Sequence, residues 1–429
     1  MRTPQRLLLV CLTFGVLAAG LSGGAAGAAS TVVLVGPVTI SPGVEFTRYD
    51  VVQSDGTKAK VHVLEIDPST SATIDVGYSK PKLPGKDYLS SWGPAQGAVA
   101  AINGDYSTND RPDHLYVQDG ALWQTGPRKG SAFGMRQDES AAYAIDPKIR
   151  VSMETETHTS VIKRWNSGAP EKSEIAGYSP EGGSIEDPPG RACSARLAPV
   201  AGSFRWARAR KGTLTNYTVQ ARRCRADPLP EKNKVVITSR RGPASLQAVI
   251  KALDKGETVT IRTAYGMPGT VDAIGGQPVL LREGTIPTFT SCTNNSTLYC
   301  KHNRTAVGFN QACAERTPGC RVYYVVVDSR LNGWSSGMNP SQLAQFFRDD
   351  LGAWGAVNLD GGGSSEMWVQ ANASYPAETC QFKSTATGCF VNRPVWTNQT
   401  PQERPVENGL LVKAGDDLYP TIEAVPLPP

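Results

Sequence analysis

The chain has 429 residues and carries 44 Lys and Arg against 39 Asp and Glu, which gives a formal net charge of +5. This near balance, without a polybasic stripe, excludes a nucleic-acid-binding protein that depends on bulk charge. A hydrophobic share of 40% excludes global disorder. The 43 glycines and 31 prolines indicate many turns and short strands rather than a helical bundle.

The first 28 residues are typical of a secretory signal peptide. Arg2 and Arg6 precede an apolar run, Leu7 to Ala19, and Ala26-Gly27-Ala28 forms a small-residue cleavage pattern. The run is shorter than the roughly 20 residues that a membrane-spanning helix needs. We therefore expect a secreted protein, or one at the exterior of the cell envelope, with no stable membrane span.

The remainder is interpreted as one domain, residues 29–415, followed by a Pro-rich tail, residues 416–429. Val61–Ile66 and Gly97–Ile102 are predicted strands, and the second has too few polar positions to face solvent. From 151 to 235 the periodicity is poor and Arg, Lys, Pro and Gly dominate. We interpret this stretch as a variable basic insertion.

Regular patterns return after this insertion. Ser245–Leu253 has helical spacing of apolar residues, and Arg321–Asp328 is the strongest strand signal in the chain. A helix is predicted between Asn339 and Gly352, with Asn339 as N-cap, a proline at the first helical position and a glutamine that completes a capping box. Two further strands are expected, at Trp354–Asp360 and Gly409–Val412.

Polar residues gather where three apolar strands run into turns. The segments are Asn103–Tyr106, Asp328–Arg330 and Asn358–Ser365, and the last contains three successive glycines. Three glycines cost conformational entropy, so they indicate positive φ or a close approach to the backbone. Consecutive amides in such a turn can bind an anion. The alternative is a tight turn without further function.

The ends of these strands carry three acids and lie near two arginines. Asp105, Asp328 and Asp360 would meet in one cleft if a central sheet brings the strand ends together. Arg304 and Arg330 flank two of the segments, and arginine binds phosphate oxygens bidentately. The combination predicts a site for a phosphorylated or otherwise anionic ligand, with acid–base capacity.

Other chemistries lack their motifs. There is no P-loop sequence and no Gly-x-Ser-x-Gly elbow. His114 and His302 have no partner at a recognisable spacing, so we interpret both as ordinary polar residues. Without a Cys-x-x-Cys, the eight cysteines other than Cys11 are better explained by disulfides in an oxidising compartment than by zinc. The simplest pairing joins neighbours in sequence: Cys193/Cys224, Cys292/Cys300, Cys313/Cys320 and Cys380/Cys389.

The order of the motifs resembles that of the phosphodiester glycosidase family. The resemblance covers about 95–140 and 255–412. It rests on six segments: Asn103–Tyr106, Ala273–Pro278, Arg304–Gly308, Val327–Arg330, Ser336–Met338 and Asn358–Ser365. The chain departs from the family at Ser329, where Gly is usual, and at Arg111–His114, where a Pro-x-Gly is usual.

The resemblance implies an α+β fold with a mixed, largely antiparallel sheet core, short helices and long Gly/Pro-rich loops. It also implies hydrolysis of a glycosyl-phosphate diester, which releases a sugar and leaves a phosphomonoester. Asp105, Asp328 and Asp360 would be catalytic, with Asp360 or Asp105 acting at the anomeric carbon. The substrate would contact Asn103, Arg304, Arg330, Asn358, Gly361, Gly362, Gly363, Ser364 and Ser365.

Two alternatives stay open. One is a non-catalytic secreted binder of phosphorylated envelope glycans. The other is a metal-dependent phosphodiesterase, because clustered Asp and Asn oxygens can hold Ca²⁺ or Mg²⁺. We assign no cofactor, and a divalent cation enters only under this second alternative. The expected partner is a phosphorylated glycan or a sugar-1-phosphodiester, and no nucleic acid.

Overall fold

The structure is a computed structural model. It describes residues 30–136, 141–144, 146–172, 174–182, 192–207, 212–224, 234–240, 244–267, 269–293, 298–395 and 399–415. The predicted signal peptide, 1–28, and the predicted tail, 416–429, lie outside the described residues.

The fold is mostly β-sheet, so the predicted α+β class is wrong. Strands make up 47% and helices 10% of the described residues. The reason is the length of the helices: the α-helices have five to nine residues and connect strands. These short helices form no layer of their own. Every described strand pairing is antiparallel except that of β14 with β15.

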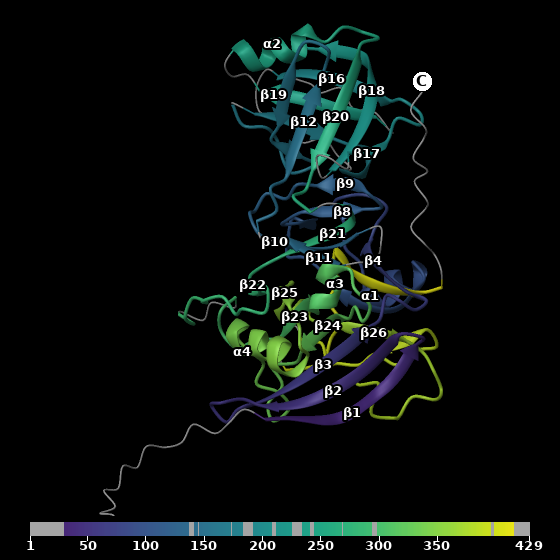
Figure 1. The fold of residues 1–429 in the computed structure, drawn as a ribbon, viewed down its shortest axis with the longest axis vertical. Coiled ribbons are helices and arrows are strands. Elements are labelled where there is room, and N and C mark those ends of the chain that lie inside the picture. The colour runs from purple at the N-terminus through teal and green to yellow at the C-terminus, as the bar shows by residue number, and fades with distance from the viewer. Residues whose placement is uncertain are drawn as a thin grey trace, which may run out of the picture.

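A seven-stranded sheet forms the lower end of the elongated molecule (Figure 1). Its central strands are fully buried because both faces are covered by apolar side chains. The predicted strand at Val61–Ile66 is confirmed as part of β3, and that at Arg321–Asp328 as β24. In spatial order the strands are β1 (Ser30–Ser41), β2 (Val44–Val52), β3 (Lys58–Ile66), β24 (Val322–Val327), β23 (Arg304–Phe309), β25 (Gly355–Asn358) and β22 (Val279–Leu281).

Two five-stranded sheets lie next to it. The first contains β5, which is buried on both faces as the sequence predicted; its order is β27 (Gly388–Phe390), β26 (Met367–Gln370), β5 (Ala98–Asn103), β28 (Asn408–Ala414) and β4 (Ala72–Tyr78). The second forms the middle of the molecule in Figure 1, in the order β11 (Ala141–Ala144), β10 (Ser131–Arg136), β21 (Thr270–Gly276), β8 (Tyr116–Gln118) and β9 (Ala121–Gln124). A small ribbon pairs β6 (Ser107–Thr108) with β7 (Arg111–Pro112).

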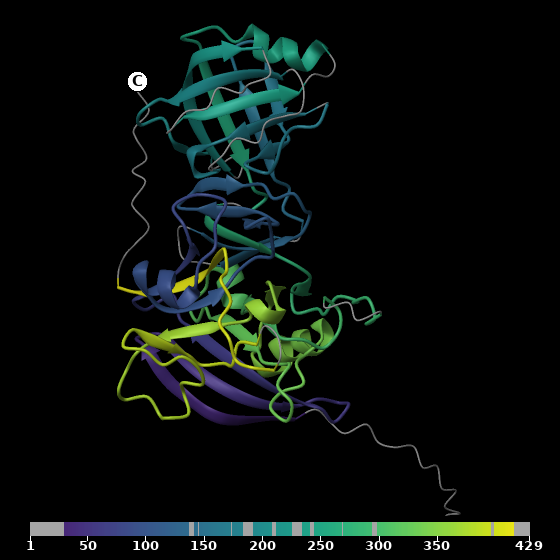
Figure 2. The same ribbon diagram turned by 180° about the vertical axis from the view of Figure 1, so that it is seen from behind.

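The upper end is a nine-stranded sheet that curls into a nearly closed barrel (Figure 2). The predicted basic insertion, 151–235, falls within this sheet, and its boundaries stay a prediction. The poor periodicity has at least two causes: the strand at Ile175–Tyr178 is buried along its whole length, and a register shift at Arg196/Leu197 interrupts the alternation of another strand. The strands are β13 (Thr159–Ile162), β12 (Arg150–Glu154), β20 (Thr258–Ala264), β18 (Gly212–Arg223), β16 (Ala192–Pro199), β19 (Val235–Arg240), β15 (Ile175–Tyr178) and β14 (Arg164–Trp165), with β17 (Arg205–Ala207) on β18.

The helices lie between strands or on the outside of a sheet. The capping box predicted at Asn339 is confirmed, because its side chain accepts from the Gln342 amide and the Gln342 side chain accepts from the Asn339 amide. A π-helical turn follows, Phe346–Asp350, and Gly352 at φ 62° leaves it. The α-helices are α1 (Leu89–Ala95), α2 (Ala244–Ala252), α3 (Gln311–Glu315) and α4 (Pro340–Gln345), and the 3-10 turns are Pro180–Gly182 and Gly362–Ser364.

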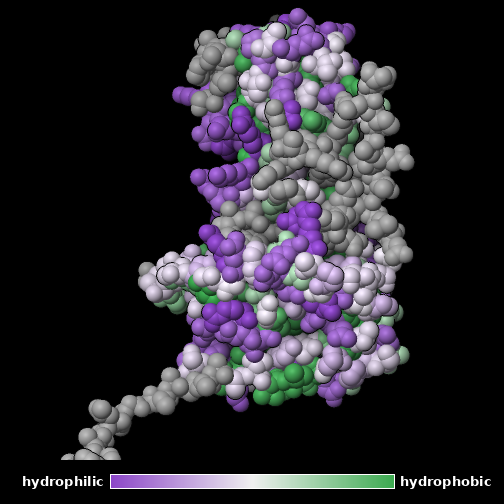
Figure 3. Space-filling view, in the orientation of Figure 1, coloured by the Kyte–Doolittle hydropathy of each residue, from purple (hydrophilic) through white to green (hydrophobic). Residues whose placement is uncertain are grey.

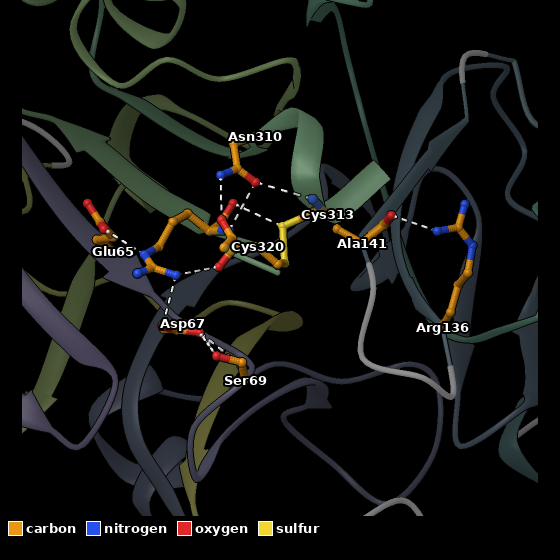
Figure 4. Close-up of a disulfide and its surroundings, with 10 residues drawn as sticks. Glu65, Asp67, Ser69, Arg136, Ala141, Asn310, Cys313 and Cys320 are labelled. Atoms are coloured by element: carbon orange, nitrogen blue, oxygen red, sulfur yellow. Dashed lines mark hydrogen bonds and ion pairs between the residues drawn. A yellow bond between two sulfur atoms is a disulfide. The ribbon is translucent and has the colours of Figure 1, made fainter. Parts of the chain in front are cut away.

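All four expected cysteine pairs form disulfides: Cys193–Cys224, Cys292–Cys300, Cys313–Cys320 and Cys380–Cys389. The third joins α3 to the chain that leads into β24, next to the Asn310 side chain that caps α3 (Figure 4). Arg321, at the start of this strand, binds Glu65 at 3.1 Å and Asp67 at 2.8 Å. The disulfide thus lies beside ion pairs that connect the start of β24 to β3 and to the residues that follow it.

The face shown in Figure 3 is mostly polar, with several hydrophobic areas, one of them at the lower end of the molecule. Val32 and Val33, on the edge strand β1, are each more than half exposed. Among the described residues no helix is long and apolar enough to cross a membrane.

Candidate active site

Three neighbouring strands of the seven-stranded sheet bring the predicted segments to one edge. β23 lies between β24 and β25, and its first residue, Arg304, pairs with Val327 at the end of β24. The chain leaving β24 carries Asp328 and Arg330 past this edge. Because β25 is also antiparallel to β23, it ends at the same edge and delivers Asp360 there.

A second sheet meets this edge through β5. The Asp360 amide donates to the Gly104 carbonyl at 2.9 Å. Asn103, 1% exposed, donates to the Asp360 carbonyl at 2.8 Å and accepts from Thr305 Oγ1 at 2.6 Å and from the Glu366 amide at 3.2 Å. Asn103 therefore holds β5, β23 and the chain entering β26 together.

A pocket of about 290 Å³ opens at this junction. It contains three arginines and one carboxylate, so its charge suits an anion. Its lining is Tyr106, Leu298, His302, Arg304, Arg330, Asp360, Gly361, Gly362, Gly363 and Arg404.

The turn Gly361–Gly363, called the glycine turn below, forms one wall of the pocket. Two of its positions require glycine for structural reasons. Gly362 has φ 64°, a region in which glycine is strongly favoured. A Cβ on Gly361 would lie 2.7 Å from the Asn303 carbonyl oxygen. The Gly361 amide donates to Asp360 Oδ1 at 2.9 Å, so the turn orients this carboxylate.

Asp360 has a strongly shifted acidity. Burial raises its pKa to about 7, and Glu407 adds to the rise. A hydrogen bond with Ser364 and the charge of Arg404 oppose it. A carboxyl group that titrates near neutral pH can accept or donate a proton during a reaction.

Two of the arginines are held in different ways. Arg304 is 2% exposed, and its Nε donates to the Met338 carbonyl at 3.0 Å. Burial lowers the pKa of Arg304 to about 10, so it remains a cation at neutral pH. Arg330 has φ 61° and extends its guanidinium to His302, with 2.7 Å between Nη2 and Nε2.

His302 is a neutral partner for this arginine. Burial and the nearby charges of Arg330 and Arg304 lower the pKa of His302 to about 4. The Nε2 atom of His302 faces the guanidinium, and its Nδ1 atom lies 3.1 Å from the Asn303 amide, which donates to it. His302 therefore orients Arg330 without adding positive charge.

Asp105 is close to the pocket but does not line it. It is 3% exposed and paired with His114, with 2.6 Å between Oδ1 and Nδ1 and 2.8 Å between Oδ2 and the His114 amide. The segment that contains it also supplies Tyr106, which is in the lining.

Asp328 is fully buried beneath the same edge of the sheet. Its carboxylate accepts from His62 Nε2 at 2.9 Å, Trp334 Nε1 at 2.8 Å and Asn392 Nδ2 at 3.1 Å. Although burial favours its neutral form, the contact with His62 and these hydrogen bonds hold the pKa of Asp328 below its usual value. Asp328 thus connects β3 with the loops that contain Trp334 and Asn392, beneath the site.

The remaining predicted residues support the pocket from behind. Asn358 is fully buried and donates to Tyr106 Oη at 2.7 Å and to the Gln277 carbonyl at 2.8 Å. Ser364 Oγ accepts from Arg404 at 3.3 Å. Ser365 is fully buried.

The sequence did not single out Tyr106, Leu298, His302 or Arg404 as site residues. Tyr106 belongs to a recognised segment, so its signal was present. His302 lies two residues before Arg304, but a histidine without a spaced partner gives no pattern. Arg404 comes from the loop before β28, where nothing in the sequence indicates a site.

Among the described residues, one acidic triplet could hold a metal ion: Asp75, Asp119 and Asp272. It contains none of the three predicted catalytic acids. Lys413 already pairs with Asp75 at 2.5 Å, so part of the charge of the triplet is neutralised. We assign no metal to it.

Known proteins resemble both the sequence and the fold. Residues 212–413 match the family model described as phosphodiester glycosidase, which confirms the resemblance for that part of the chain. No curated protein matches. A crystal structure of a hypothetical protein from Synechocystis has a similar fold, with 17% identity and a TM-score of 0.60 over 87% of this chain and 64% of that one. A crystal structure of a protein from Burkholderia pseudomallei also has a similar fold, with 19% identity and a TM-score of 0.57 over 83% of this chain and 74% of that one. This chain thus spans less than two thirds of the Synechocystis protein, and both likenesses concern the fold alone.

Proposed function

We propose that this chain, which matches the phosphodiester glycosidase family over residues 212–413, hydrolyses a glycosyl-phosphate diester. The products are a free sugar and a phosphomonoester. The observation that carries this proposal is the pocket that combines Asp360, with a pKa near 7, with three arginines and a glycine turn.

The phosphate is bound by Arg330 and Arg404, which line the pocket together with the glycine turn. Arg304 lies in the wall and adds a fixed positive charge that stabilises the departing phosphate dianion. A phosphomonoester is already a fair leaving group, so the reaction needs little help from a general acid.

Asp360 acts on the sugar side. Among the described lining residues it is the one carboxylate, so the role at the anomeric carbon falls to it. In its ionised form it attacks that carbon or takes a proton from water. Asp105 and Asp328, both buried, act as positioning residues for the segments that line the pocket.

The proposed location is outside the cell. The N-terminal segment has the pattern of a cleaved leader. Four disulfides are typical of proteins from oxidising compartments. The proposed partner is accordingly a phosphorylated glycan of the envelope or the medium.

The test is turnover of a panel of sugar-1-phosphodiesters by the wild type, by Asp360→Asn and by a matched control, Asp349→Asn. Asp349 is exposed on the π-helical turn and pairs with Arg348. We expect Asp360→Asn to lose at least about 10³-fold in kcat, with the control at the wild-type rate and chelator without effect. Saturable binding of every diester without sugar release would instead support a non-catalytic binder. Loss of activity with chelator would support a metallophosphodiesterase.

A further inference from the structure

A second cavity, of about 340 Å³, lies where the middle sheet meets the barrel-like sheet. It is formed by the loop between β9 and β10, the turn before β12 and the residue after β13, regions that adjoin in Figure 1. Four cationic side chains line it: Arg128, Lys129, Lys148 and Lys163. Asp146 is the one acid among the described lining residues.

His114 closes the inner end of this basic cavity. It is 1% exposed, and its Nδ1 and its amide both contact Asp105. Its Nε2 has no hydrogen-bond partner among the described residues. This atom lies beside Gly130, because a Cβ on Gly130 would be 2.6 Å from it. A buried polar nitrogen of this kind is costly unless a ligand or water completes it.

The local charges favour a donor at this position. Burial lowers the pKa of His114, but the charge and the hydrogen bond of Asp105 outweigh it, and the net pKa is raised. In the protonated ring Nδ1 donates to Asp105, and Nε2 is left as a buried donor beside Gly130. His114 and Gly130 both line the cavity, so this nitrogen lies in its wall, and lysine and arginine side chains are part of the same lining.

The basic cavity borders a third cavity, of about 430 Å³, with which it shares Lys129, Gly130 and Asp146. The lining of the third cavity includes Tyr299, the residue after Leu298, which lines the candidate active site.

Tyr106 lies between the candidate active site and the histidine of the basic cavity. Its ring meets the His114 ring edge-on with 6.0 Å between centroids, and it also lines the candidate active site. The two anion-attracting places are therefore distinct but close enough for one extended ligand.

We propose that the basic cavity is a second phosphate subsite, and that the substrate is a glycan chain with repeated phosphate groups. One phosphodiester lies at Asp360 for cleavage, and a further phosphate of the same chain accepts from His114 Nε2 and pairs with Lys148 and Lys163. This inference rests on the proposed function for the identity of the substrate. The binding of phosphate at the second subsite can be measured without it.

The histidines provide a reporter in each place. The chain has four, of which His302 lines the candidate active site, His114 lines the basic cavity, and His62 and His158 line neither. The experiment is a titration of the protein with inorganic phosphate at constant pH and ionic strength. The assigned Cε1–H resonances of the histidines are followed by NMR.

We expect saturable shifts at His114 and at His302. The double variant Lys148→Gln/Lys163→Gln should weaken the apparent Kd at His114 by about tenfold or more and leave the response of His302 in place. The charge-matched control is Lys251→Gln/Lys255→Gln, two exposed lysines in and after α2, which should change neither response. A silent His114, or a His114 shift that survives the lysine variant, would overturn the second subsite. A responsive His302 in that case would leave the proposed function standing.

A substrate pair connects this subsite to catalysis. The same glycosyl phosphodiester is compared with and without an additional phosphate on the aglycone. We expect the added phosphate to lower KM, and the Lys148→Gln/Lys163→Gln variant to lose that advantage. Equal KM values for the two substrates in the wild type would contradict the assignment of a multiply phosphorylated substrate.

Discussion

Individual neighbouring side chains raise or lower the pKa of Asp360. Burial and Glu407 favour its neutral form, whereas Ser364 and Arg404 favour its ionised form. The outcome is a pKa of about 7 instead of the usual 3.8. Because the proposed reaction uses the carboxylate, its pH dependence reports directly on this balance.

We predict that kcat/KM rises with pH and levels off above an apparent pKa near 7. Arg404→Gln removes a charge that lowers the pKa of Asp360, so the rise should move to higher pH. Glu407→Gln removes a charge that raises the pKa, so it should move to lower pH. The measurement is the pH profile of kcat/KM with a sugar-1-phosphodiester.

Arg348→Gln is the control for these profiles, because Arg348 is exposed and pairs with its neighbour Asp349. Its profile should match the wild type. If the profiles of Arg404→Gln and Glu407→Gln shift in the same direction, or if neither shifts, the pH dependence of kcat/KM does not come from the ionisation of Asp360.

Ionisation of Asp360 should also lower the free energy of unfolding of the protein. In the unfolded chain its pKa is near 3.8 and in the folded chain about 7, so the unfolded state loses its proton first. This contribution to stability is complete below about pH 4, falls between pH 4 and 7, and stays low above. At about 1.4 kcal/mol for each pKa unit, a difference of about three units corresponds to a loss on the order of 4 kcal/mol.

Asp360→Asn is therefore expected to unfold at a higher temperature than the wild type at pH 8, and to show no such gain at pH 4. Thermal unfolding followed by circular dichroism at the two pH values checks this. An Asn variant that is less stable at pH 8 would mean that the ionised carboxylate is well solvated or paired in the folded protein.

At the scale of elements, the site depends on the junction between two sheets. Asn103 ends β5 and binds both Asp360 and Thr305, the second residue of β23. Its side chain is buried, so its loss leaves several polar groups without partners. The position of Asp360 relative to the arginines therefore depends on this one amide.

We predict that Asn103→Ala destabilises the protein by about 2–4 kcal/mol and lowers kcat more than it raises KM. Denaturant unfolding and steady-state kinetics test both parts. The control is Asn372→Ala, since Asn372 is exposed and caps only its own turn. Normal kcat in a folded Asn103→Ala protein would show that the junction does not position Asp360.

The sequence predicted elements whose signals are local. The capping box at Asn339 and the apolar runs of β5 and β24 lie within a few neighbouring residues, and the structure confirms them. The barrel-like sheet was missed because strands such as β15 and β19 are buried almost throughout and do not alternate, and because a bulge interrupts β16. The class was wrong because the short helices that the sequence predicted connect strands and form no layer of their own.

At the scale of the whole molecule, only part of the site is visible in the sequence. The arginines Arg304 and Arg330 and the glycine turn lie in segments with clear motifs, and they share one pocket. Arg404 and His302 enter the same pocket through long-range folding, which no local pattern encodes. Asp105 was predicted as an acid at a strand end, but its burial against His114 depends on contacts between loops.

The two proposed subsites involve different sheets. Residues at one edge of the seven-stranded sheet line the candidate active site, and loops of the middle sheet and of the barrel-like sheet line the basic cavity. A chain bound in both would therefore contact more than one sheet. The barrel-like sheet would then contribute to substrate binding, through Lys163 after β13.

The most direct test of the central claim is the position of the label after turnover of a sugar-1-phosphodiester in ¹⁸O-water. Attack at the anomeric carbon, with phosphate as the leaving group, puts ¹⁸O into the released sugar and none into the phosphomonoester. Mass spectrometry of the two products distinguishes the cases. Label in the phosphomonoester would mean cleavage of the P–O bond, and would contradict a glycosidase centred on Asp360.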